Sequence, residues 1–298
     1  MRVYEPLAHR GEALQVLRTL LSRGPVPYTP HPGEWDWWTF HADPRDQLET
    51  LIGPEAVAEI AINHGEVAAF GLSPPEVIEL GRTRLPGVRF SVTHVSIDDE
   101  ARVDALRAAG FELDHPPAPL FERATAGATS IEVEGFEIRP IRGEEEHEAR
   151  ADAARLAFAS TLDPKAHRAR YLRFMRSPGY APERDIVAVA PDGTVASFAI
   201  YWQDDALSLG QFEPVGTHPG FQRRGLARAL LHAGLARLAA AGIRRARVMT
   251  GGANEAAKAT YLAAGFRLVD EIAAYRAPAS FGSMPIDPSA AASPDTAP

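Results

Sequence analysis

The chain has 298 residues, of which 45% are hydrophobic and 23% charged, with a net charge of −8 and no cysteine. The absence of cysteine excludes disulfides, thiolate metal sites and a cysteine nucleophile. The sequence contains no apolar run of about eighteen residues, so we predict no transmembrane helix. Met1 to Arg10 lack the apolar segment of a signal peptide, and we expect a cytoplasmic protein. The ten histidines form no H-x-H or H-E-x-x-H pair, so we expect no metal site.

The charge is divided unevenly along the chain. Residues 1–135 hold about 11 basic and 21 acidic residues, whereas residues 136–278 hold about 20 basic and 16 acidic ones. Nucleic-acid binding needs a stronger basic excess, so Arg244, Arg245 and Arg247 do not indicate it. A polyanionic small molecule bound by the second half fits this imbalance, and so does an ordinary solvated surface.

The first half shows signals of a mixed α/β structure. We predict a helix, three strands and a hairpin turn, in chain order Gly11–Ser22 (helix), Glu34–Phe40 (strand), Val57–Ile62 (strand), His64-Gly65 (turn) and Val88–Ile97 (strand). The aromatic segment EWDWWTF at Glu34–Phe40 is interpreted as core or domain interface, with a substrate-lining strand as the alternative.

The second half also alternates between strand and helix patterns. The predicted strands are Phe136–Ile141, Asp185–Ala190, Val195–Trp202, Leu207–Gly216 and Arg245–Thr250, and the predicted helices are Glu144–Ala159, Pro164–Met175 and Gly225–Ala241. Asp192-Gly193 is typical of the turn of a β-hairpin.

Two segments indicate an internal repeat. Asp98–Leu113 and Ala253–Leu268 each follow a β-like run, begin with polar residues, continue as an Ala-rich helix and end in Gly-Phe. Glu122–Ser130 is small and polar and looks like a linker between the two halves. We therefore expect domains at 1–125 and 136–278, a linker at 126–135, and a disordered Pro/Ala/Ser-rich tail at 279–298.

The most informative segment is FEPVGTHPGFQRRGLARALL, at Phe212–Leu231. A strand ends near Val215, a turn follows, and Gln222–Ala227 opens a helix. The first turn of a helix carries amides without internal partners and favours negative charge, and small residues let a ligand approach the backbone. Pyrophosphate fits such a site, while the alternative is a tight turn in which Gly225 only permits the bend. Neither a Walker loop nor a Rossmann fingerprint is present.

This segment resembles the acetyl-CoA loop of the GNAT superfamily of N-acetyltransferases. The family pattern Gln/Arg-x-x-Gly-x-Gly/Ala is met by Gln222, Gly225 and Ala227, and the order of elements downstream also agrees. An Asn-led helix with a tyrosine and a Gly-Phe pair follow, at Asn254, Tyr261 and Gly265-Phe266. The resemblance covers residues 136–277. It implies an α/β fold of two tandem GNAT-like domains, each with a mixed, mostly antiparallel sheet flanked by helices.

The resemblance also implies roles for individual residues. The amides of Gln222 to Ala227, including Leu226, would hold the pyrophosphate of CoA, with Arg223 and Arg224 adding charge. The strand Val215-Gly216-Thr217 would pair with the pantetheine arm, and the Val215 amide would face the thioester oxygen. Asn254 would contact the cofactor arm, or would only cap its helix.

The catalytic acid and base follow from the same resemblance and from spacing. Tyr261 would protonate the leaving thiolate, and a core aromatic is the alternative. Glu213 shares a strand face with Val215 and is the first candidate for the base, ahead of His218. In the first half, FGLSPPEVI at Phe70–Ile78 replaces the loop and Leu106 replaces the tyrosine, so we expect a degenerate domain without a cofactor site.

The sequence thus predicts an acetyl-CoA-dependent N-acetyltransferase acting on a primary amine of a small molecule by direct attack, without nucleic-acid or membrane partners. The rival interpretation is a non-catalytic acyl-CoA-binding sensor or scaffold protein.

Overall fold

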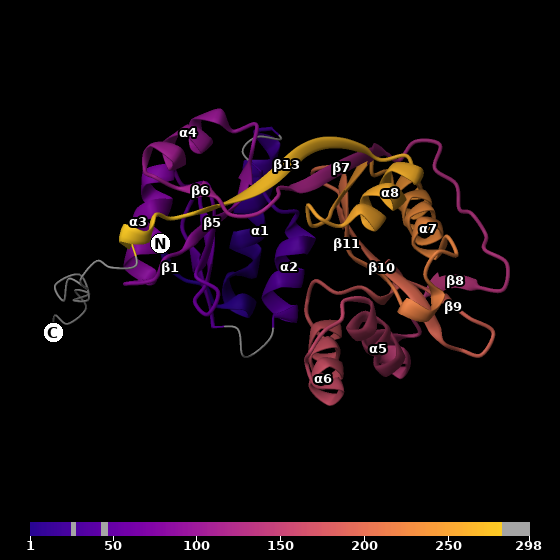
Figure 1. The fold of residues 1–298 in the computed structure, drawn as a ribbon. Coiled ribbons are helices and arrows are strands. Elements are labelled where there is room, and N and C mark those ends of the chain that lie inside the picture. Colours follow the sequence, from indigo (N-terminus) through magenta and orange to yellow (C-terminus); the bar gives the residue numbers. More distant parts are fainter. Residues whose placement is uncertain (25–27, 43–46, 282–298) are drawn as a thin grey trace. The chain divides into compact units, whose positions relative to one another are not determined.

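The computed structural model describes residues 1–24, 28–42 and 47–281. The chain divides into two compact units (Figure 1), and each unit draws on separate stretches of sequence. The first comprises Met1–Thr29, Pro44–Pro117 and Glu271–Pro298, and the second Pro30–Asp43 and Ala118–Asp270. The units are therefore interleaved along the chain, rather than consecutive as in the expected division into 1–125 and 136–278.

The first unit is a mixed sheet with helices. Its elements are β1 (Arg2–Val3), α1 (Pro6–Ser22), β2 (Leu48–Ile52), β3 (Val57–Ala61), β4 (Glu66–Phe70), α3 (Pro74–Arg84), β5 (Ser91–Ser96), α4 (Glu100–Ala108), β6 (Glu112–Leu113) and η4 (Ala279–Phe281). The strand β13 (Arg267–Arg276) begins in the second unit, and its residues 271–276 lie in the first, where it pairs antiparallel with β5. Among the described strand pairs of this unit, only β4 and β5 are parallel.

The second unit repeats the plan. Its elements are α2 (Pro32–His41), β7 (Ala118–Ala124), β8 (Glu137–Pro140), η1 (Gly143–Glu146), α5 (His147–Ala157), α6 (Pro164–Met175), η2 (Pro182–Arg184), β9 (Asp185–Val189), β10 (Val195–Asp204), β11 (Leu209–Thr217), η3 (Pro219–Phe221), α7 (Leu226–Ala240), β12 (Arg245–Met249) and α8 (Glu255–Ala263). The strand order is β7-β12-β11-β10-β9-β8, and of the described pairs in this order only β11 with β12 is parallel. The predicted mixed, mostly antiparallel α/β architecture is confirmed.

The repeat lies in the corresponding elements of the two units. In each, two neighbouring parallel strands are joined through a helix, β4-α3-β5 in the first and β11-α7-β12 in the second. The helices α4 and α8 both end before a glycine with positive φ, Gly110 at 81° and Gly265 at 79°. A left-handed residue at this position favours glycine. The phenylalanine that follows is buried in both units.

The aromatic segment Glu34–Phe40 is a helix, so the predicted strand is wrong. His31 caps α2 by accepting a hydrogen bond from Gly33, and Glu34 accepts one from the main-chain N–H of His31. Pro32 occupies the first turn, where its missing N–H costs nothing. This two-sided cap outweighs the strand preference of the three tryptophans. The core position expected for the segment is confirmed for Trp35, whose side chain is 0% exposed.

Two boundary predictions also need correction. The strand β7 includes Glu122 to Ala124, which pair with β12. The small, polar stretch predicted as a linker therefore begins with the end of a strand. Within the expected tail, Ala279–Phe281 form a 3-10 turn, because Phe281 packs on Phe90 and Phe111 at ring distances of 5.9 and 5.5 Å. The remainder of that tail, 282–298, lies outside the described residues. Among the described residues, no helix is long and apolar enough to cross a membrane.

Candidate functional site

The central feature of the second unit is a divergence of two parallel strands. β11 pairs with β12 from Leu209 to Phe212, whose partner is Val248, but β11 itself continues to Thr217. On its other side the register with β10 shifts between Ala199 and Tyr201, as expected of a β-bulge. Beyond Phe212, therefore, none of the described strands pairs with the edge of β11 that faced β12.

The backbone direction of β11 can be followed through this open region. The N–H of His218 donates to the Ala196 oxygen at 2.9 Å, and the Ser197 hydroxyl donates to the Gly216 oxygen at 2.8 Å. Main-chain polar groups alternate sides along a strand. The N–H and C=O groups of Val215 and Thr217 consequently point to the open edge, where an extended ligand can pair with them.

The loop after β11 has the features of an anion site. Arg223 and Gly225 both have positive φ, at 65° and 77°, and Gly225 is the N-cap of α7. No side chain caps this helix, and its first turn holds no acidic residue. Successive amides in such a turn form a concave anion-binding surface, supported by the helix dipole. A Cβ added at Gly225 would meet no atom within 4 Å, so the loop lies open toward a ligand.

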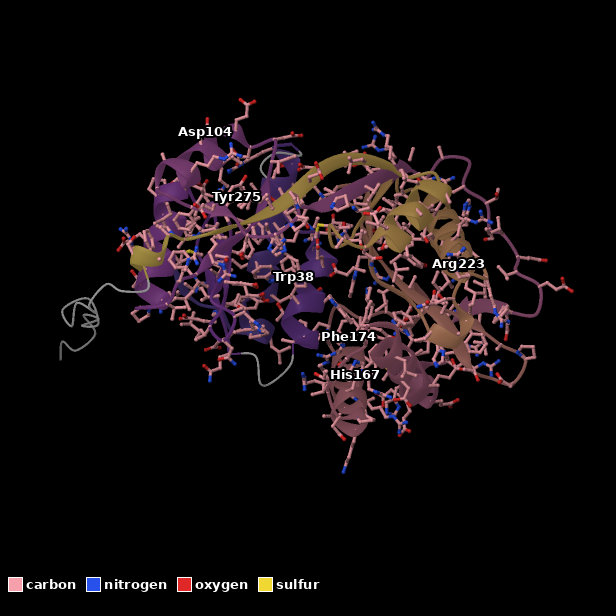
Figure 2. The ribbon with its side chains drawn as sticks, viewed as in Figure 1. Trp38, Asp104, His167, Phe174, Arg223 and Tyr275 are labelled. Carbon is pink, nitrogen blue, oxygen red and sulfur yellow. The ribbon has the colours of Figure 1, made fainter. Side chains whose placement is uncertain are left out.

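The two arginines of the loop are exposed to solvent. Arg223 is labelled in Figure 2. The guanidinium of Arg224 lies 5.6 Å from the ring centre of Phe221. Both side chains are thus positioned beside the uncapped start of α7, where their charge adds to that of the helix terminus.

Tyr261 lies on α8, and its ring packs against Phe121 and Phe266 with centroid distances of 5.8 and 6.3 Å. Its pKa is raised above the usual value, first by burial and then by the carboxyl group of Glu213. The fold thus brings together the predicted acid and base. Asn254 caps α8 by accepting a hydrogen bond from Ala257 at 3.1 Å, which is the alternative role that the sequence left open.

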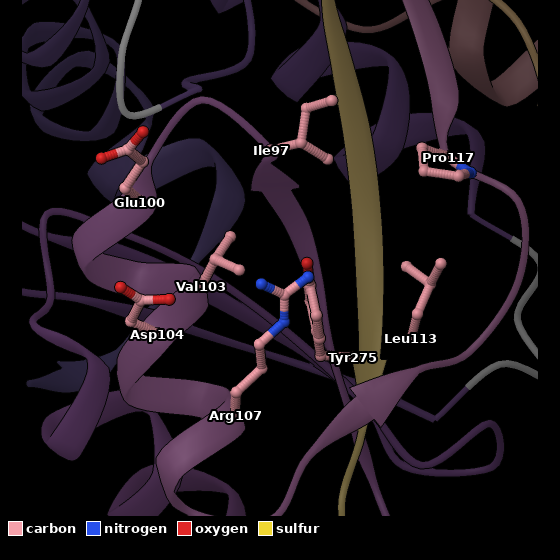
Figure 3. Close-up of a pocket in the computed structure, with 8 residues that line it drawn as sticks. All are labelled: Ile97, Glu100, Val103, Asp104, Arg107, Leu113, Pro117 and Tyr275. Atoms are coloured by element: carbon pink, nitrogen blue, oxygen red, sulfur yellow. The ribbon is translucent and has the colours of Figure 1, made fainter.

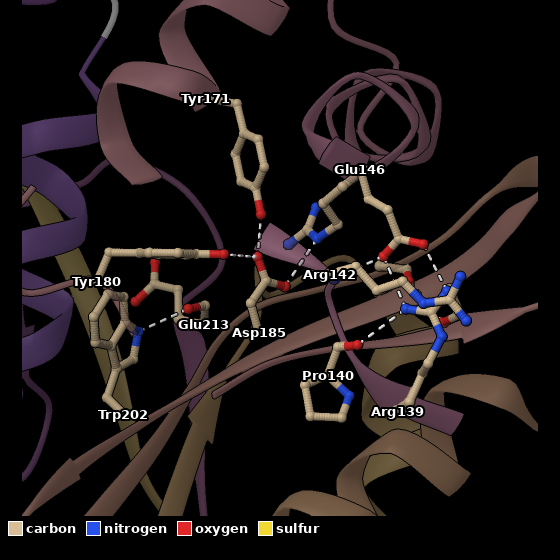
Figure 4. Close-up of polar contacts among 12 residues, drawn as sticks. Arg139, Pro140, Arg142, Glu146, Tyr171, Tyr180, Asp185, Trp202 and Glu213 are labelled. Atoms are coloured by element: carbon tan, nitrogen blue, oxygen red, sulfur yellow. Dashed lines mark hydrogen bonds and ion pairs between the residues drawn. The ribbon is translucent and has the colours of Figure 1, made fainter. Parts of the chain in front are cut away.

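Glu213 lies at the bulge of β11. Its main-chain oxygen accepts a hydrogen bond of 2.7 Å from the Trp202 indole (Figure 4), and its side-chain Oε2 is buried without a hydrogen-bond partner among the described residues. The pKa of Glu213 is raised well above its usual value by burial and by the neighbouring Glu34 carboxyl group, against the effect of a hydrogen bond from Trp38. Such a shift moves a carboxylate toward the pKa that suits a base at neutral pH.

His218, the second candidate base, has a structural role. Its Nδ1 accepts a hydrogen bond from the Gly220 amide at 3.0 Å, and it caps η3 in this way. This nitrogen is therefore engaged, whereas Oε2 of Glu213 accepts no bond.

Sequence reasoning missed the contribution of α2. Glu34 and Trp38 both act on Glu213, which follows them by 179 and 175 residues in the sequence, and sequence patterns predict a strand for them. The pattern His31-Pro32-x-Glu34 was the available signal, since proline in the first turn and glutamate at the third position are typical of a helix start.

A cavity of about 480 Å³ lies elsewhere, in the first unit beside α4 and β13 (Figure 3). Asp104, Arg107 and Tyr275 are among its lining residues, together with Glu100. It contains none of the predicted site residues, and its two carboxylates disfavour a polyanionic ligand. In the part of the chain that the structure covers, no group of three or more His, Asp or Glu side chains could hold a metal ion.

Residues 150–266, which contain the open strand edge, the uncapped helix and Tyr261, match the model of the acetyltransferase (GNAT) family. This segment is a GNAT acetyltransferase domain. No match was found among curated proteins.

Solved GNAT structures extend the likeness of fold to nearly the whole chain. A GCN5-related N-acetyltransferase from Sphaerobacter thermophilus is 16% identical, with a TM-score of 0.64 over 93% of this chain and 95% of that one. A tandem GNAT protein from the clavulanic acid biosynthesis pathway is 15% identical, with the same TM-score over 91% and 94%. A GNAT-family acetyltransferase from Colwellia psychrerythraea is 12% identical, with a TM-score of 0.58 over 93% and 99%.

Proposed function

We propose that the protein is an acetyl-CoA-dependent N-acetyltransferase that acts on a primary amine of a small molecule. The observation that supports this most is the open edge of β11, which runs from the uncapped start of α7 to the bulge at Glu213. Pyrophosphate oxygens would accept hydrogen bonds from the amides of residues 222–227. The pantetheine arm would extend along Val215 and Thr217, which brings the thioester toward Glu213 and Tyr261.

The proposed reaction is direct attack within a ternary complex. Glu213 takes a proton from the ammonium group of the acceptor, and the resulting amine nitrogen forms a bond with the acetyl carbon. The Val215 N–H donates to the thioester oxygen as negative charge develops there. When the carbon–sulfur bond breaks, Tyr261 donates its proton to the sulfur, and the nitrogen loses its second proton to solvent as the amide forms. Glu213 then releases its proton to solvent and Tyr261 regains one, so that the cycle gives amide, CoA thiol and one released proton. A covalent acyl-enzyme on cysteine is excluded because the chain has none.

We propose further that the first unit does not bind CoA. The start of α3 is closed by a capping box between Ser73 and Glu76, in which the Ser73 N–H donates to the Glu76 carboxylate at 2.7 Å. A carboxylate in the first turn of α3 repels an anion there, and Pro74 removes one amide. The last described pair between β4 and β5 is Ala68 with Thr93, and the ring of the next residue, His94, lies 6.0 Å from those of Tyr28 and Phe70.

The test is release of CoA from acetyl-CoA in the presence of a panel of primary amines, followed with a thiol reagent. Since the protein has no cysteine, the reagent reports only product thiol. We expect release that depends on the amine, with acetylated amine found by mass spectrometry. Tight acetyl-CoA binding without turnover of any amine would instead support a sensor or scaffold.

A further inference from the structure

We propose that the cavity beside α4 and β13 is a ligand site of the first unit, and that it binds a free amino acid of the lysine type, with an ammonium group at the end of its side chain. The described residues that line the cavity all belong to the first unit. The inference is independent of the acetyl transfer proposed for the second unit. It gives a binding role to a unit for which we propose no CoA site.

The cavity has the size and the apolar surface of a small-molecule pocket. It measures about 480 Å³ and is lined by α4 on one side and by β6 and β13 on the other (Figure 3). Ligand pockets commonly measure about 300–1,000 Å³. Four of the lining side chains are apolar, namely Ile97, Val103, Leu113 and Pro117. Ile97 and Leu113 are 37% and 52% exposed, so part of this apolar surface is open to a ligand.

A buried tyrosine hydroxyl opens into the cavity. The side chain of Tyr275 belongs to the core of the first unit and is only 3% exposed. Its hydroxyl forms no hydrogen bond with another residue of the described chain, and in Figure 3 it is directed at the middle of the cavity. Buried polar groups normally have a hydrogen-bond partner, and one without a partner is costly. Tyr275 therefore offers a fixed hydrogen-bonding group to a molecule in the cavity.

Three charged side chains of α4 line the same cavity. Glu100, Asp104 and Arg107 are spaced by four and then three residues, so they follow one face of the helix. Among the described residues, none of the three forms an ion pair or a side-chain hydrogen bond. Glu100 in the first turn and Arg107 in the last suit the helix dipole. The dipole does not explain why all three charges border a cavity.

The order of these charges matches one class of ligand. Along α4 the order is negative, negative, positive, over about 10 Å of helix axis. Arg107 and Tyr275 together offer hydrogen-bond donors to a carboxylate. Asp104, one turn away, accepts from an ammonium group beside that carboxylate. Glu100, a further turn away, accepts from a second ammonium group at the end of an aliphatic chain. A molecule with these three groups in this order is a diamino acid such as lysine.

The net charge agrees with this assignment. Two carboxylates and one guanidinium leave the cavity with one net negative charge, and free lysine carries one net positive charge at neutral pH. The apolar side chains of Ile97, Val103 and Leu113 can pack against its methylene groups. A simple amine would leave Arg107 without a counter-ion, and an acidic amino acid or a phosphate would face two carboxylates.

Isothermal titration calorimetry of the full chain with free L-lysine, at low ionic strength and without acetyl-CoA, tests the site. Two analogues each lack one charged group. Norleucine has no ammonium group on its side chain, and 1,5-diaminopentane has no carboxylate. We expect lysine to bind at least about tenfold more tightly than either analogue, because each leaves one charge of the cavity unpaired.

Two variants assign the charged groups of the ligand to residues. Arg107→Gln should weaken the binding of lysine at least about tenfold without weakening that of 1,5-diaminopentane, which has no carboxylate. Glu100→Gln should weaken the binding of lysine to a similar extent without weakening that of norleucine. Both positions are exposed, and glutamine has a helix propensity close to those of arginine and glutamate, so folding should be retained. Glu79→Gln, an exposed position of α3 outside the cavity, is the control.

Each outcome decides for or against the site. Preference for lysine, lost in the matching variant, supports it. If lysine does not bind, binds no more tightly than both analogues, or binds both variants as it binds the wild type, the inference is overturned. Should a variant not fold, the comparison of the three ligands on the wild-type protein still decides. Because no acetyl-CoA or turnover is involved, failure of the proposed acetyl transfer leaves this result unchanged. Lysine bound as an acceptor by the second unit would be unaffected by Arg107→Gln.

Discussion

Arg150 on α5 and Asp185 at the start of β9 form an ion pair of 3.0 Å, with side chains only 1% and 0% exposed. Asp185 also accepts hydrogen bonds from the hydroxyls of Tyr171 and, at 3.2 Å, Tyr180 (Figure 4). The guanidinium of Arg150 lies 3.7 Å from the ring centre of Phe198. These contacts join α5 and α6 to the sheet that carries the site.

Asp185→Asn should therefore be strongly destabilising, because it leaves the Arg150 charge buried without a counter-ion. We expect a loss of about 3–5 kcal/mol in the free energy of unfolding, measured by urea titration followed by circular dichroism. Glu134→Gln, which removes an exposed carboxylate, should change it by less than about 0.5 kcal/mol. A loss below about 1 kcal/mol for Asp185→Asn would argue against the importance of the pair.

Gly225→Asp tests the anion site at the start of α7. A carboxylate there would compete with phosphate for the uncapped amides, so acetyl-CoA affinity should fall at least about a hundredfold in calorimetry, equivalent to about 3 kcal/mol. The matched control is Gly225→Asn, which has almost the same shape and tolerates positive φ. Equal affinity for the two variants would show that charge at this position is irrelevant.

Tyr261→Phe tests the proposed acid. The ring contacts with Phe121 and Phe266 remain, so stability and acetyl-CoA affinity should barely change. General acid catalysis contributes roughly 10²–10⁴-fold, and we expect kcat with the best amine to fall at least about tenfold. Unchanged turnover would leave Tyr261 as a packing residue, and a loss of affinity alone would make it a cofactor contact.

The number of CoA sites per chain follows from the two helix starts. In the proposed function the uncapped start of α7 binds the anion and the start of α3, closed by Glu76, does not, so titration calorimetry should give one acetyl-CoA per chain. Gly225→Asp should abolish this single site. Two equivalent sites in the wild-type protein would contradict the proposed degeneracy of the first unit.

The buried His167 makes stability depend on pH. Burial, followed by the charges of Arg170 and Arg155, lowers its pKa to about 4 from an ordinary 6.5. Between these values the unfolded chain binds more protons, so stability rises as the pH increases from about 4 to 6.5 and is lost on acidification. His167→Phe should reduce this dependence by roughly 1–3 kcal/mol in urea titrations across that range. A slope identical to wild type would show that His167 has the same pKa in the folded protein and in the unfolded chain.

Local signals explain what the sequence could predict. The loop at Gln222–Ala227 and the Gly-Phe ends of α4 and α8 are short patterns whose geometry depends on neighbouring residues, so their placement was predictable. The conformation of Glu34–Phe40 was not, because alternating aromatics also suit a strand, and a histidine is an unusual helix cap. The approach of Glu34 to Glu213 depends on tertiary contacts of α2 that no periodicity reveals.

The interleaved units have a consequence for synthesis on the ribosome. β5 receives its partner β13 only when residues 271–276 emerge, after residues 118–270 of the second unit have been synthesised. Until then the first unit cannot complete its sheet, and the edge of β5 stays exposed. The second unit has no such delay, because its N-terminal element α2 has already been synthesised. A nascent chain released at residue 270 would retain every residue of the proposed acetyl-transfer site and yet lack the strand that completes its first unit. Premature termination or C-terminal proteolysis is thus expected to act on the domain farthest away in sequence.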